Sequence, residues 1–302
     1  MFKNTDLNTV SFGEILFDVF GEEKKVGGAP LNLALRMRSF GFPVTMISAV
    51  GNDDDGQNLK KYISDNGVEV NTILTNPTHE TGLVQVYLNE KGSATYDIKF
   101  PSAWDFIQIN DNVKTSIQDA DILFFGSLAC RNDVSKNTLF ELIKSNSEMY
   151  KVFDVNLRKP HYEINVLKSL MDTSDFIKFN DDEILEIASG LGFSSDSLED
   201  NMSFISENTN TKAICVTRGK HGSILLWENR WYYHSGYVVE VVDTVGAGDS
   251  FLAALIAKLM IDKDPQEALR FAGAVGAIVA THPGANPKIQ DFEIDDIIKK
   301  SL

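Results

Sequence analysis

The sequence VVDTVGAGDSFLAALIAKLM (residues 241–260) has a turn of small residues directly before an apolar helical pattern. The turn is Gly246-Ala247-Gly248, and Asp249 follows it. Glycine reaches backbone angles that other residues avoid, so several N–H groups of such a turn can converge on one point. The N-terminus of the following helix adds a partial positive charge at the same place. This combination predicts an anion-binding site suited to a phosphoryl group that gains charge during transfer.

Asp249 stands at the beginning of that helix. In most proteins an aspartate at this position would only cap the helix. Beside an anion-binding turn, the same carboxylate can also accept the proton of a hydroxyl group that attacks a phosphate. An ordinary aspartate pKa of about 4 leaves such a base ionised at neutral pH, so we expect no special adjustment of its pKa. Asp249 is therefore the candidate catalytic base.

Two other phosphate-binding motifs do not fit this stretch. A P-loop requires a Lys-Ser or Lys-Thr pair after its last glycine, whereas Gly248 is followed by Asp249-Ser250. A dinucleotide fingerprint requires a third glycine or an alanine at the position of Phe251. A dinucleotide-dependent oxidoreductase is therefore disfavoured.

The rest of the chain predicts the elements that would position this turn. Short apolar runs alternate with helical patterns, which is typical of βαβ units and of a mostly parallel sheet covered on both faces. The expected strands are at residues 44–50, 68–74, 121–126, 151–155, 175–179, 212–216 and 222–227, and two clear helices are at 30–40 and 57–65. We therefore expect a single α/β domain over residues 1–302, a three-layer α/β/α sandwich with a mostly parallel central sheet.

Two segments depart from this alternation. Residues 13–26 have the pattern of a strand pair around a charged turn. Residues 83–100 alternate apolar and polar side chains around a turn at 89–92, which predicts a half-exposed antiparallel hairpin. Together the two segments could form a small antiparallel β sheet that projects from the main body. Such a sheet is either edge decoration or a lid over a ligand.

Polar residues follow three successive strands of the predicted sheet. They are Asn156 and Arg158 after residues 151–155, Asn180 and Glu183 after 175–179, and Thr217 after 212–216. Open α/β sheets bind ligands outside the carboxyl ends of their strands, so these strand ends indicate one crevice. Asn180 and Glu183 also have the spacing of a helix capping box. Their functional interpretation is magnesium binding through water, because Mg²⁺ near phosphates keeps most of its water ligands.

Two sequence signatures resemble those of the ribokinase-like (PfkB) sugar kinases. The C-terminal signature is Asp243-Thr244-Val245-Gly246-Ala247-Gly248-Asp249, and the N-terminal signature is Gly27-Gly28-Ala29-Pro30-Leu31-Asn32-Leu33-Ala34, continuing through Gly41, Val50-Gly51, Asp53, Asp55 and Gly56. The resemblance covers nearly the whole chain. It implies the ribokinase-like fold, a β lid that closes over the sugar, and ATP-dependent phosphorylation of a sugar hydroxyl group, with ATP and Mg²⁺ as cofactors.

The resemblance also implies roles for individual residues. Asp249 would be the catalytic base, and Gly246, Ala247 and Gly248 would form the anion hole. Glu183, together with Asn180, would organise Mg²⁺. The residues on the nucleotide side would be Asn180, Thr217, Gly219, Gly222 and Asn286, with the stretch His282–Asn286 near the adenine. Asp243 and the backbone of Val245 match a monovalent-cation loop of many members, which implies a site for K⁺.

On the sugar side, the resemblance implies Asp18, Gly28, Asn32 and Arg158. One carboxylate can hold two neighbouring hydroxyl groups, and an asparagine amide can both donate and accept hydrogen bonds. The sequence Gly-Gly-Ala-Pro resembles fructokinases, as does the stretch 153–158, in which Val155 replaces the usual proline. D-fructose is therefore the expected substrate. Kinases for 2-keto-3-deoxygluconate also use an arginine at this position to hold a carboxylate, which leaves that sugar acid as the alternative.

The composition limits the partners. There are 43 acidic and 28 basic residues, and the formal net charge of −15 argues against binding to nucleic acid or to an anionic membrane. Cys130 and Cys215 lie in apolar runs and indicate buried thiols in a reducing compartment. No uninterrupted apolar signal sequence is found at the N-terminus, and the apolar helix after Phe251 meets Lys258 too soon to span a bilayer, so we expect a cytoplasmic protein.

The expected partners are a small sugar and ATP. We also expect a homodimer formed through the β lid, because a small sheet with an apolar face seldom stands alone. A sugar or nucleotide sensor without catalysis is the alternative from another functional class. Asp249 disfavours a sensor, since binding alone needs no base beside an anion hole.

Overall fold

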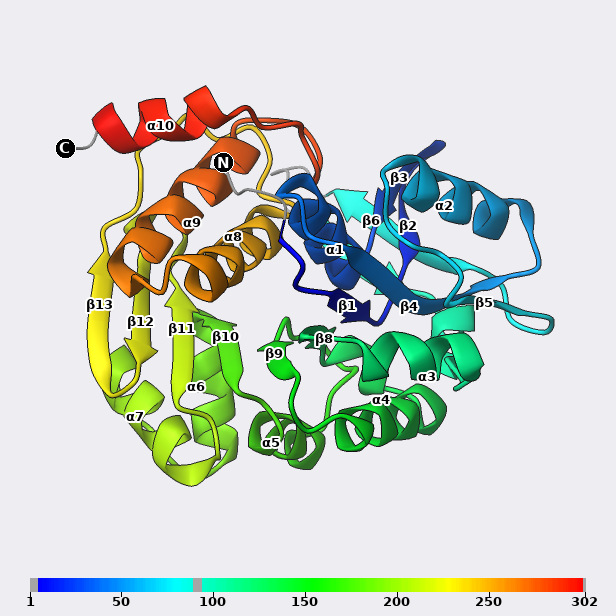
Figure 1. The fold of residues 1–302 in the computed structure, drawn as a ribbon, viewed down its shortest axis with the longest axis horizontal. Helices are drawn as coiled ribbons and strands as arrows, with labels where there is room; N and C mark the ends of the chain where they lie inside the picture. Colours follow the sequence, from blue (N-terminus) through cyan, green and yellow to red (C-terminus); the bar gives the residue numbers. More distant parts are fainter. Residues whose placement is uncertain (1–4, 89–93, 301–302) are drawn as a thin grey trace.

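The computed structural model describes residues 5–88 and 94–300, and Figure 1 gives the arrangement of its helices and strands. The strands are β1 (Thr9–Phe12), β2 (Leu16–Phe20), β3 (Glu23–Gly27), β4 (Val44–Gly51), β5 (Ile73–Asn76), β6 (Gly82–Leu88), β7 (Ala94–Ile98), β8 (Ile122–Gly126), β9 (Tyr150–Asp154), β10 (Phe176–Asn180), β11 (Ala213–Thr217), β12 (Ser223–Trp227) and β13 (Arg230–His234). The helices are α1 (Ala29–Ser39), α2 (Asp54–Asp65), α3 (Asp111–Gln118), α4 (Asp133–Ser145), α5 (Ile164–Asp172), α6 (Asp181–Gly190), α7 (Leu198–Asn208), α8 (Ala247–Ile261), α9 (Pro265–Ala280) and α10 (Asp291–Lys300). Three short 3₁₀ turns are η1 (Ala103–Phe106), η2 (Leu128–Cys130) and η3 (Gly219–His221).

A nine-stranded sheet forms the centre, in the order β13-β12-β11-β10-β9-β8-β1-β4-β5. The strands from β11 to β5 pair in parallel, whereas β12 and β13 extend the sheet in antiparallel pairs. Helices α1, α8 and α9 cover one face, and α3 to α7 cover the other (Figure 1). The apolar strand sequences are explained by this arrangement, because both faces of the sheet are buried.

Each face of the sheet has its own apolar core. Leu31, Leu255 and Val275 belong to the core beneath α1, α8 and α9. Ile117, Leu142 and Ile187 belong to the core beneath the helices of the opposite face. The three-layer α/β/α sandwich expected from the sequence is therefore confirmed.

The second sheet has four strands in the order β3-β2-β6-β7. β2 pairs with β3 and β6 pairs with β7 in antiparallel hairpins, as expected for residues 13–26 and 83–100. The two hairpins meet through a parallel pair of β2 and β6, which the sequence did not indicate. The turn expected at 89–92 lies outside the described residues. Trp104 and Leu128 pack against this sheet and join it to the main body.

Two expected elements differ in detail. The strand expected at 68–74 is regular only from Ile73, and Glu69 makes an isolated bridge with Thr45 before it. The sequence predicts the run 222–227 as a strand of a mostly parallel sheet. The corresponding strand β12 is antiparallel to β11. The short connection between them explains this direction, because a parallel pair needs a crossover of about a dozen residues or more.

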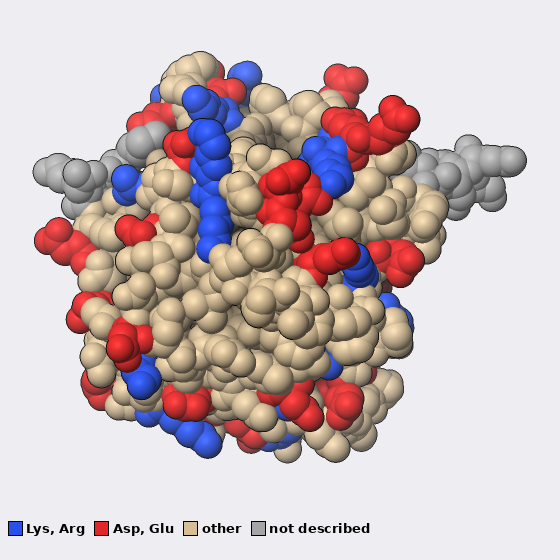
Figure 2. Space-filling model, turned by 90° about the vertical axis from the view of Figure 1, so that its right-hand side faces the viewer, with Lys and Arg blue, Asp and Glu red and all other residues tan. Residues whose placement is uncertain are grey.

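The surface carries both signs of charge, and Figure 2 shows one face on which Asp and Glu are interspersed with Lys and Arg. Cys130 and Cys215 are buried and unpaired, as their apolar surroundings in the sequence indicated. Within the described part of the chain, none of the helices has the length and apolar character required to cross a membrane.

Candidate active site

The carboxyl ends of β9, β10 and β11 lie side by side along one edge of the large sheet. In the parallel register Asn180 on β10 is the partner of Thr217 on β11. Asn156, just after β9, takes a left-handed conformation with φ of 41°, which asparagine tolerates better than most residues. Beyond Thr217, the turn η3 begins at Gly219 and ends before Gly222. The polar strand ends thus line one edge, as the sequence predicted.

The turn before α8 has the conformation that its glycine permits. Gly246 is the residue before the helix, with φ of 73°. A Cβ atom at this position would lie 2.5 Å from the Cβ atom of Ala285, so no larger residue fits without displacement. The helix behind the turn is apolar on nearly all sides, because α8 lies between α1 and α9 (Figure 1). The N–H groups of the turn therefore sit at a rigidly held helix terminus, and Asp249 lies in its first turn.

The carboxylate of Asp249 is held by the N-terminal sequence signature. Asn32 on α1 donates from Nδ2 to Oδ2 of Asp249 at 2.8 Å. Asn286 in turn donates from Nδ2 to Oδ1 of Asn32 at 2.7 Å. The sequence predicts Asn286 on the adenine side, and in the structure its amide lies beside Asn32, which holds the candidate base. The adenine contact of Asn286 stays a prediction.

The expectation of an ordinary pKa for Asp249 is wrong. Burial and the nearby charge of Asp154 raise its pKa from 3.8 to about 6, against the opposing effects of Asn32, Lys178 and Arg158. Sequence alone could not reveal this, because Asp154 belongs to a distant strand. The carboxylate is still mostly ionised at neutral pH, and the higher pKa makes it a stronger proton acceptor.

Hydrogen bonds and charge interactions link the four predicted sugar-side residues to Asp249 or to one another. Asp18 lies on β2, and burial raises its pKa to about 6, with Arg158 acting in the opposite direction. Arg158 is exposed, and its positive charge also lowers the pKa of Asp249. Gly28 precedes α1 with φ of 110°, and a Cβ atom there would lie 2.4 Å from the carbonyl oxygen of Glu14. Asp18, Gly28, Asn32 and Arg158 are thus grouped near Asp249.

Glu14 is a further carboxyl group that the sequence analysis did not single out. Its side chain is buried, and its Oε2 has no hydrogen-bond partner among the described residues. Burial raises its pKa to about 7, and the charges of Arg158 and Asp249 also act on it. The available signal was a glutamate inside the otherwise apolar stretch GEILF, where a charged residue is unusual.

Asn180 and Glu183 form the capping box that their spacing predicted. Asn180 Oδ1 accepts from the backbone N–H of Glu183 at 2.8 Å, and Glu183 Oε2 accepts from the N–H of Asn180 at 2.7 Å. Glu183 Oε1 also accepts from the N–H of Leu157 at 2.9 Å, which ties α6 to the end of β9. Burial raises the pKa of Glu183. The structural interpretation of this pair is therefore confirmed, and the magnesium role stays a prediction.

The oxygen atoms of Asn180 and Glu183 are of the kind that Mg²⁺ prefers. In residues 5–88 and 94–300 there is no group of three or more His, Cys, Asp or Glu side chains that could hold a metal ion directly.

Asp243 connects the two loops of the expected cation site. Its Oδ1 accepts from the N–H of Val245 at 3.0 Å, and its Oδ2 accepts from the N–H of Gly284 at 3.0 Å. These bonds hold the segment before the anion-binding turn against the segment before Asn286. K⁺ binding at this site stays a prediction.

Known proteins share the sequence pattern and the fold of this chain. The chain matches the family model for pfkB family carbohydrate kinase over residues 3–291. It is 30% identical to fructokinase-2 of Solanum lycopersicum over 310 residues, which cover 93% of this chain and 92% of that protein. Fructokinase with bound ATP from Xylella fastidiosa is similar in fold, with a TM-score of 0.87 at 22% identity over 97% of this chain and 98% of that chain.

A second solved structure is more similar in sequence. It is a fructokinase double mutant from Vibrio cholerae O395 in a fructose, ADP and potassium ion bound form. Its TM-score is 0.85 at 25% identity, over 98% of this chain and 99% of that chain. With a family match that spans nearly the whole sequence, this chain belongs to the pfkB family of carbohydrate kinases.

Proposed function

We propose that this carbohydrate kinase transfers the γ-phosphoryl group of ATP to a hydroxyl group of D-fructose, with Asp249 as general base. The hydroxyl oxygen forms a bond to the γ-phosphorus, the bond from that phosphorus to the β–γ bridging oxygen breaks, and ADP leaves. Asp249 accepts the hydroxyl proton. The observation that carries the proposal is the position of Asp249 in the first turn of α8, beside the anion-binding turn and held by Asn32 at 2.8 Å.

The anion-binding turn would steady the phosphoryl group while it moves. Charge is spread over the equatorial oxygens of a loose transition state, so catalysis depends on positioning and on electrostatic stabilisation. The N–H groups of residues 246–248 and the N-terminus of the buried helix α8 offer fixed dipoles for this purpose. Asn32 would orient the carboxylate toward the attacking hydroxyl group.

The charges around the sugar side favour a neutral sugar over a sugar acid. Three carboxyl groups, those of Asp18, Glu14 and Asp249, lie near the exposed guanidinium group of Arg158. The other cations that act on them are already paired, Arg131 with Asp105 and Lys178 with Asp154. A substrate carboxylate would meet repulsion from these groups, whereas sugar hydroxyl groups can donate to them. The Vibrio cholerae fructokinase crystallised with fructose and ADP is consistent with the same choice.

Mg²⁺ would bind at the edge formed by Asn180 and Glu183, mostly through water, and would neutralise charge on the nucleotide phosphates. Thr217, Gly219 and Gly222 would flank the nucleotide.

Asp243, together with the backbone of Val245, would bind K⁺. The support for K⁺ is the potassium ion bound form of the Vibrio cholerae relative. Its test is the dependence of the rate on K⁺ against Na⁺ at constant ionic strength.

The small sheet would act as a lid that excludes water from the transfer. Trp104 of η1 and Leu128 of η2 pack against its apolar face, which supports treating residues 1–302 as one kinase domain. Tyr87 on β6 is 59% exposed, and a second copy of the lid would cover it in a homodimer. Sedimentation of the wild type and of Tyr87→Asp tests this: a dimer that becomes a monomer supports it, and a monomeric wild type contradicts it.

The substrate is tested by ADP release from the purified protein with ATP and Mg²⁺. The acceptors are D-fructose, D-ribose, 2-keto-3-deoxygluconate and adenosine, each over a range of concentrations. We expect the highest kcat/KM with fructose, and sugar-dependent ADP release from Asp249→Asn that is slower by roughly a hundredfold or more. A higher kcat/KM with 2-keto-3-deoxygluconate would overturn the choice of sugar while leaving the kinase assignment intact.

A further inference from the structure

A buried ion pair lies at the carboxyl ends of two neighbouring strands. Lys178 on β10 donates from Nζ to Oδ1 of Asp154 on β9 at 3.0 Å. The side chains are only 8% and 2% exposed. Neither residue was singled out by the sequence analysis, although each interrupts an apolar strand.

The ammonium group of Lys178 lies behind the anion-binding turn. A Cβ atom built on Gly248 would be 3.4 Å from Nζ, so the turn backbone and the ammonium group are near neighbours. In the described part of the chain, Asp154 is the hydrogen-bond partner of Nζ, and Oδ2 of Asp154 is buried without a partner. Within residues 5–88 and 94–300, two N–H groups of the ammonium ion and one carboxylate oxygen thus have no hydrogen-bond partner.

This placement is unfavourable for stability alone. A positive charge at the N-terminus of α8 has the wrong sign for the helix dipole. A buried ion pair with an unsatisfied oxygen rarely repays its desolvation, and apolar residues of similar volume would serve at least as well. The same positive charge has the right sign for an anion bound at the turn. Costly polar groups of this kind are concentrated at functional sites.

We propose that Lys178 is a positioning residue for phosphoryl transfer: held by Asp154, its ammonium group supplies positive charge behind the turn formed by Gly246, Ala247 and Gly248. This inference rests on the proposed function of that turn. Lys178 need not contact the substrate, because its field acts on the turn and on Asp249 in a site of low polarity.

The electrostatic surroundings are consistent with this role. Burial alone would lower the pKa of Lys178, but the charges of Asp154, Glu183 and Asp249 outweigh burial and raise it, so the group stays charged. Lys178 and Arg158 lower the pKa of Asp249, and Asp154 raises it. The charge of Asp249 also acts on Glu14, whose pKa it raises together with burial.

The test separates the charge of Lys178 from the integrity of the pair. Lys178→Met removes the charge, and we expect kcat to fall by about tenfold or more while the sugar KM changes by less than about threefold. Asp154→Asn leaves the ammonium group in place, so kcat should fall by less than about threefold. In this variant the acid limb of the pH profile should move to lower pH, because Asp249 loses a negative neighbour.

The double variant Asp154→Asn/Lys178→Met distinguishes stability from catalysis. It contains no unpaired buried charge, so its melting temperature should exceed that of Lys178→Met alone. Its kcat should nevertheless stay as low as that of Lys178→Met. If Lys178→Met does not fold, the kcat of the double variant still measures the effect of removing the positive charge.

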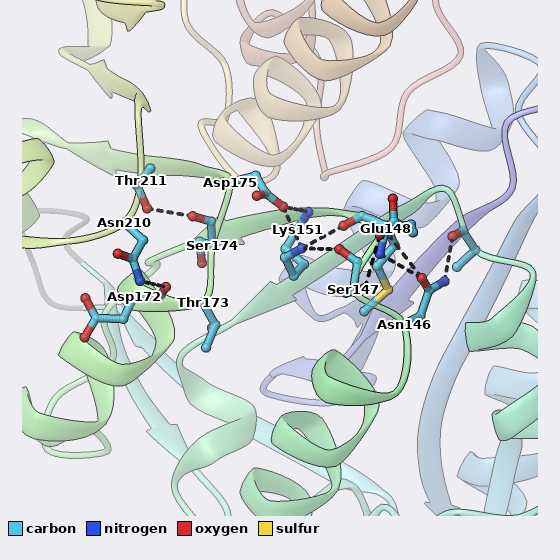
Figure 3. A network of polar contacts seen from close by, with 12 residues as sticks. Asn146, Ser147, Glu148, Lys151, Asp172, Thr173, Ser174, Asp175, Asn210 and Thr211 are labelled. Atoms are coloured by element: carbon cyan, nitrogen blue, oxygen red, sulfur yellow. Dashed lines mark hydrogen bonds and ion pairs between the residues drawn. The ribbon is translucent and has the colours of Figure 1, made fainter.

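A matched control exists at the other end of the same two strands. Lys151 on β9 pairs with Asp175, just before β10, at 2.9 Å. Figure 3 shows this pair within a network of polar contacts that includes Ser147 and Glu148. Lys151→Met should leave kcat and the acid limb at their wild-type values, because the pair is about 10 Å along the strand from Asp154.

Two outcomes would overturn the inference: equal kcat losses in the two single variants, or a double variant whose kcat recovers together with its stability. Either result would make the pair structural. Asp249→Asn is measured in parallel. If that variant turned over normally, the proposed function of the site would fail, whereas an inactive Asp249→Asn beside a fully active Lys178→Met would refute only the role of Lys178.

Discussion

Asn32 on α1 and Asp249 at the start of α8 share a hydrogen bond of 2.8 Å between Nδ2 and Oδ2. The two residues belong to signatures at opposite ends of the chain, and the packing of α1 against α8 brings them together. Asn286 fixes the orientation of the Asn32 amide, because it donates to Oδ1 and leaves Nδ2 to face the carboxylate. The candidate base is therefore positioned by three segments of the chain.

Replacing Asp249 by Asn should remove the proton acceptor while keeping the shape of the site. We expect kcat to fall by roughly a hundredfold or more, the usual size of a general-base effect, with sugar binding retained. Steady-state kinetics and calorimetric titration of the sugar measure the two quantities. The variant should also melt no lower than the wild type at pH 8, because the raised pKa means that ionised Asp249 costs stability above about pH 6. Near-normal turnover would remove Asp249 from the mechanism.

Asn286→Leu should release the amide of Asn32 without touching the carboxylate. Loss of one neutral hydrogen bond is worth about 1 kcal/mol, so kcat should fall by about threefold to tenfold. If Asn286 acts on the base rather than on the nucleotide, the KM for ATP should stay nearly constant. A rise in the ATP KM with unchanged kcat would instead support the adenine-side role expected from the sequence.

The sandwich could be predicted from the sequence because buried parallel strands appear as continuous apolar runs, such as residues 122–126. The direction of β12 could not be predicted from its composition, since a buried strand has the same composition in either direction. The parallel contact between β2 and β6 was equally hidden, because it joins two hairpins that are distant in sequence. Both features depend on connections rather than on the residues of the strands.

For the site, the two signatures pointed to the turn, to Asp249 as candidate base and to Gly28 and Asn32, whereas Asp18 and Arg158 came from the wider family resemblance. The charges around them were not predictable. Asp154 and Lys178 face each other only because β9 and β10 are neighbours, and their effect on Asp249 depends on burial. The usable signal was a charged residue in the middle of an apolar strand, which is rarely tolerated unless it is paired.

The pH dependence of the reaction should reflect the raised pKa of Asp249. The base works only when it is deprotonated, so a pKa of about 6 moves the acid limb of the rate up from the ordinary aspartate range. We expect kcat to fall as the pH decreases through about 6. Asp18 also has a pKa of about 6, and its protonation should affect kcat/KM for the sugar. A kcat that stays constant down to pH 4.5 would contradict the environment described for Asp249.

Asp18→Ala should weaken sugar binding. A carboxylate that accepts hydroxyl hydrogen bonds contributes about 1.5 to 3 kcal/mol, so the sugar KM should rise by roughly tenfold to a hundredfold. The ATP KM should change little, because Asp18 lies on β2 of the small sheet, which we propose as the lid over the sugar. Asp97→Ala is the control, since Asp97 is an exposed carboxylate on β7 of the same sheet. A collapse of ATP affinity in Asp18→Ala would show that the lid covers the nucleotide instead.

Gly246→Ala should disable the anion-binding turn. A residue with a Cβ atom at φ of 73° costs about 1 to 2 kcal/mol, and the new atom would lie 2.5 Å from Cβ of Ala285. The turn must shift to relieve this contact, so its N–H groups lose their common direction and kcat should fall by about tenfold or more. Gly192→Ala separates the two effects, because Gly192 has φ of 91° and a Cβ atom there would meet nothing within 4 Å. Both variants should lose thermal stability, but only Gly246→Ala should lose kcat; a Gly246→Ala variant with wild-type turnover would mean that the phosphoryl group is steadied elsewhere.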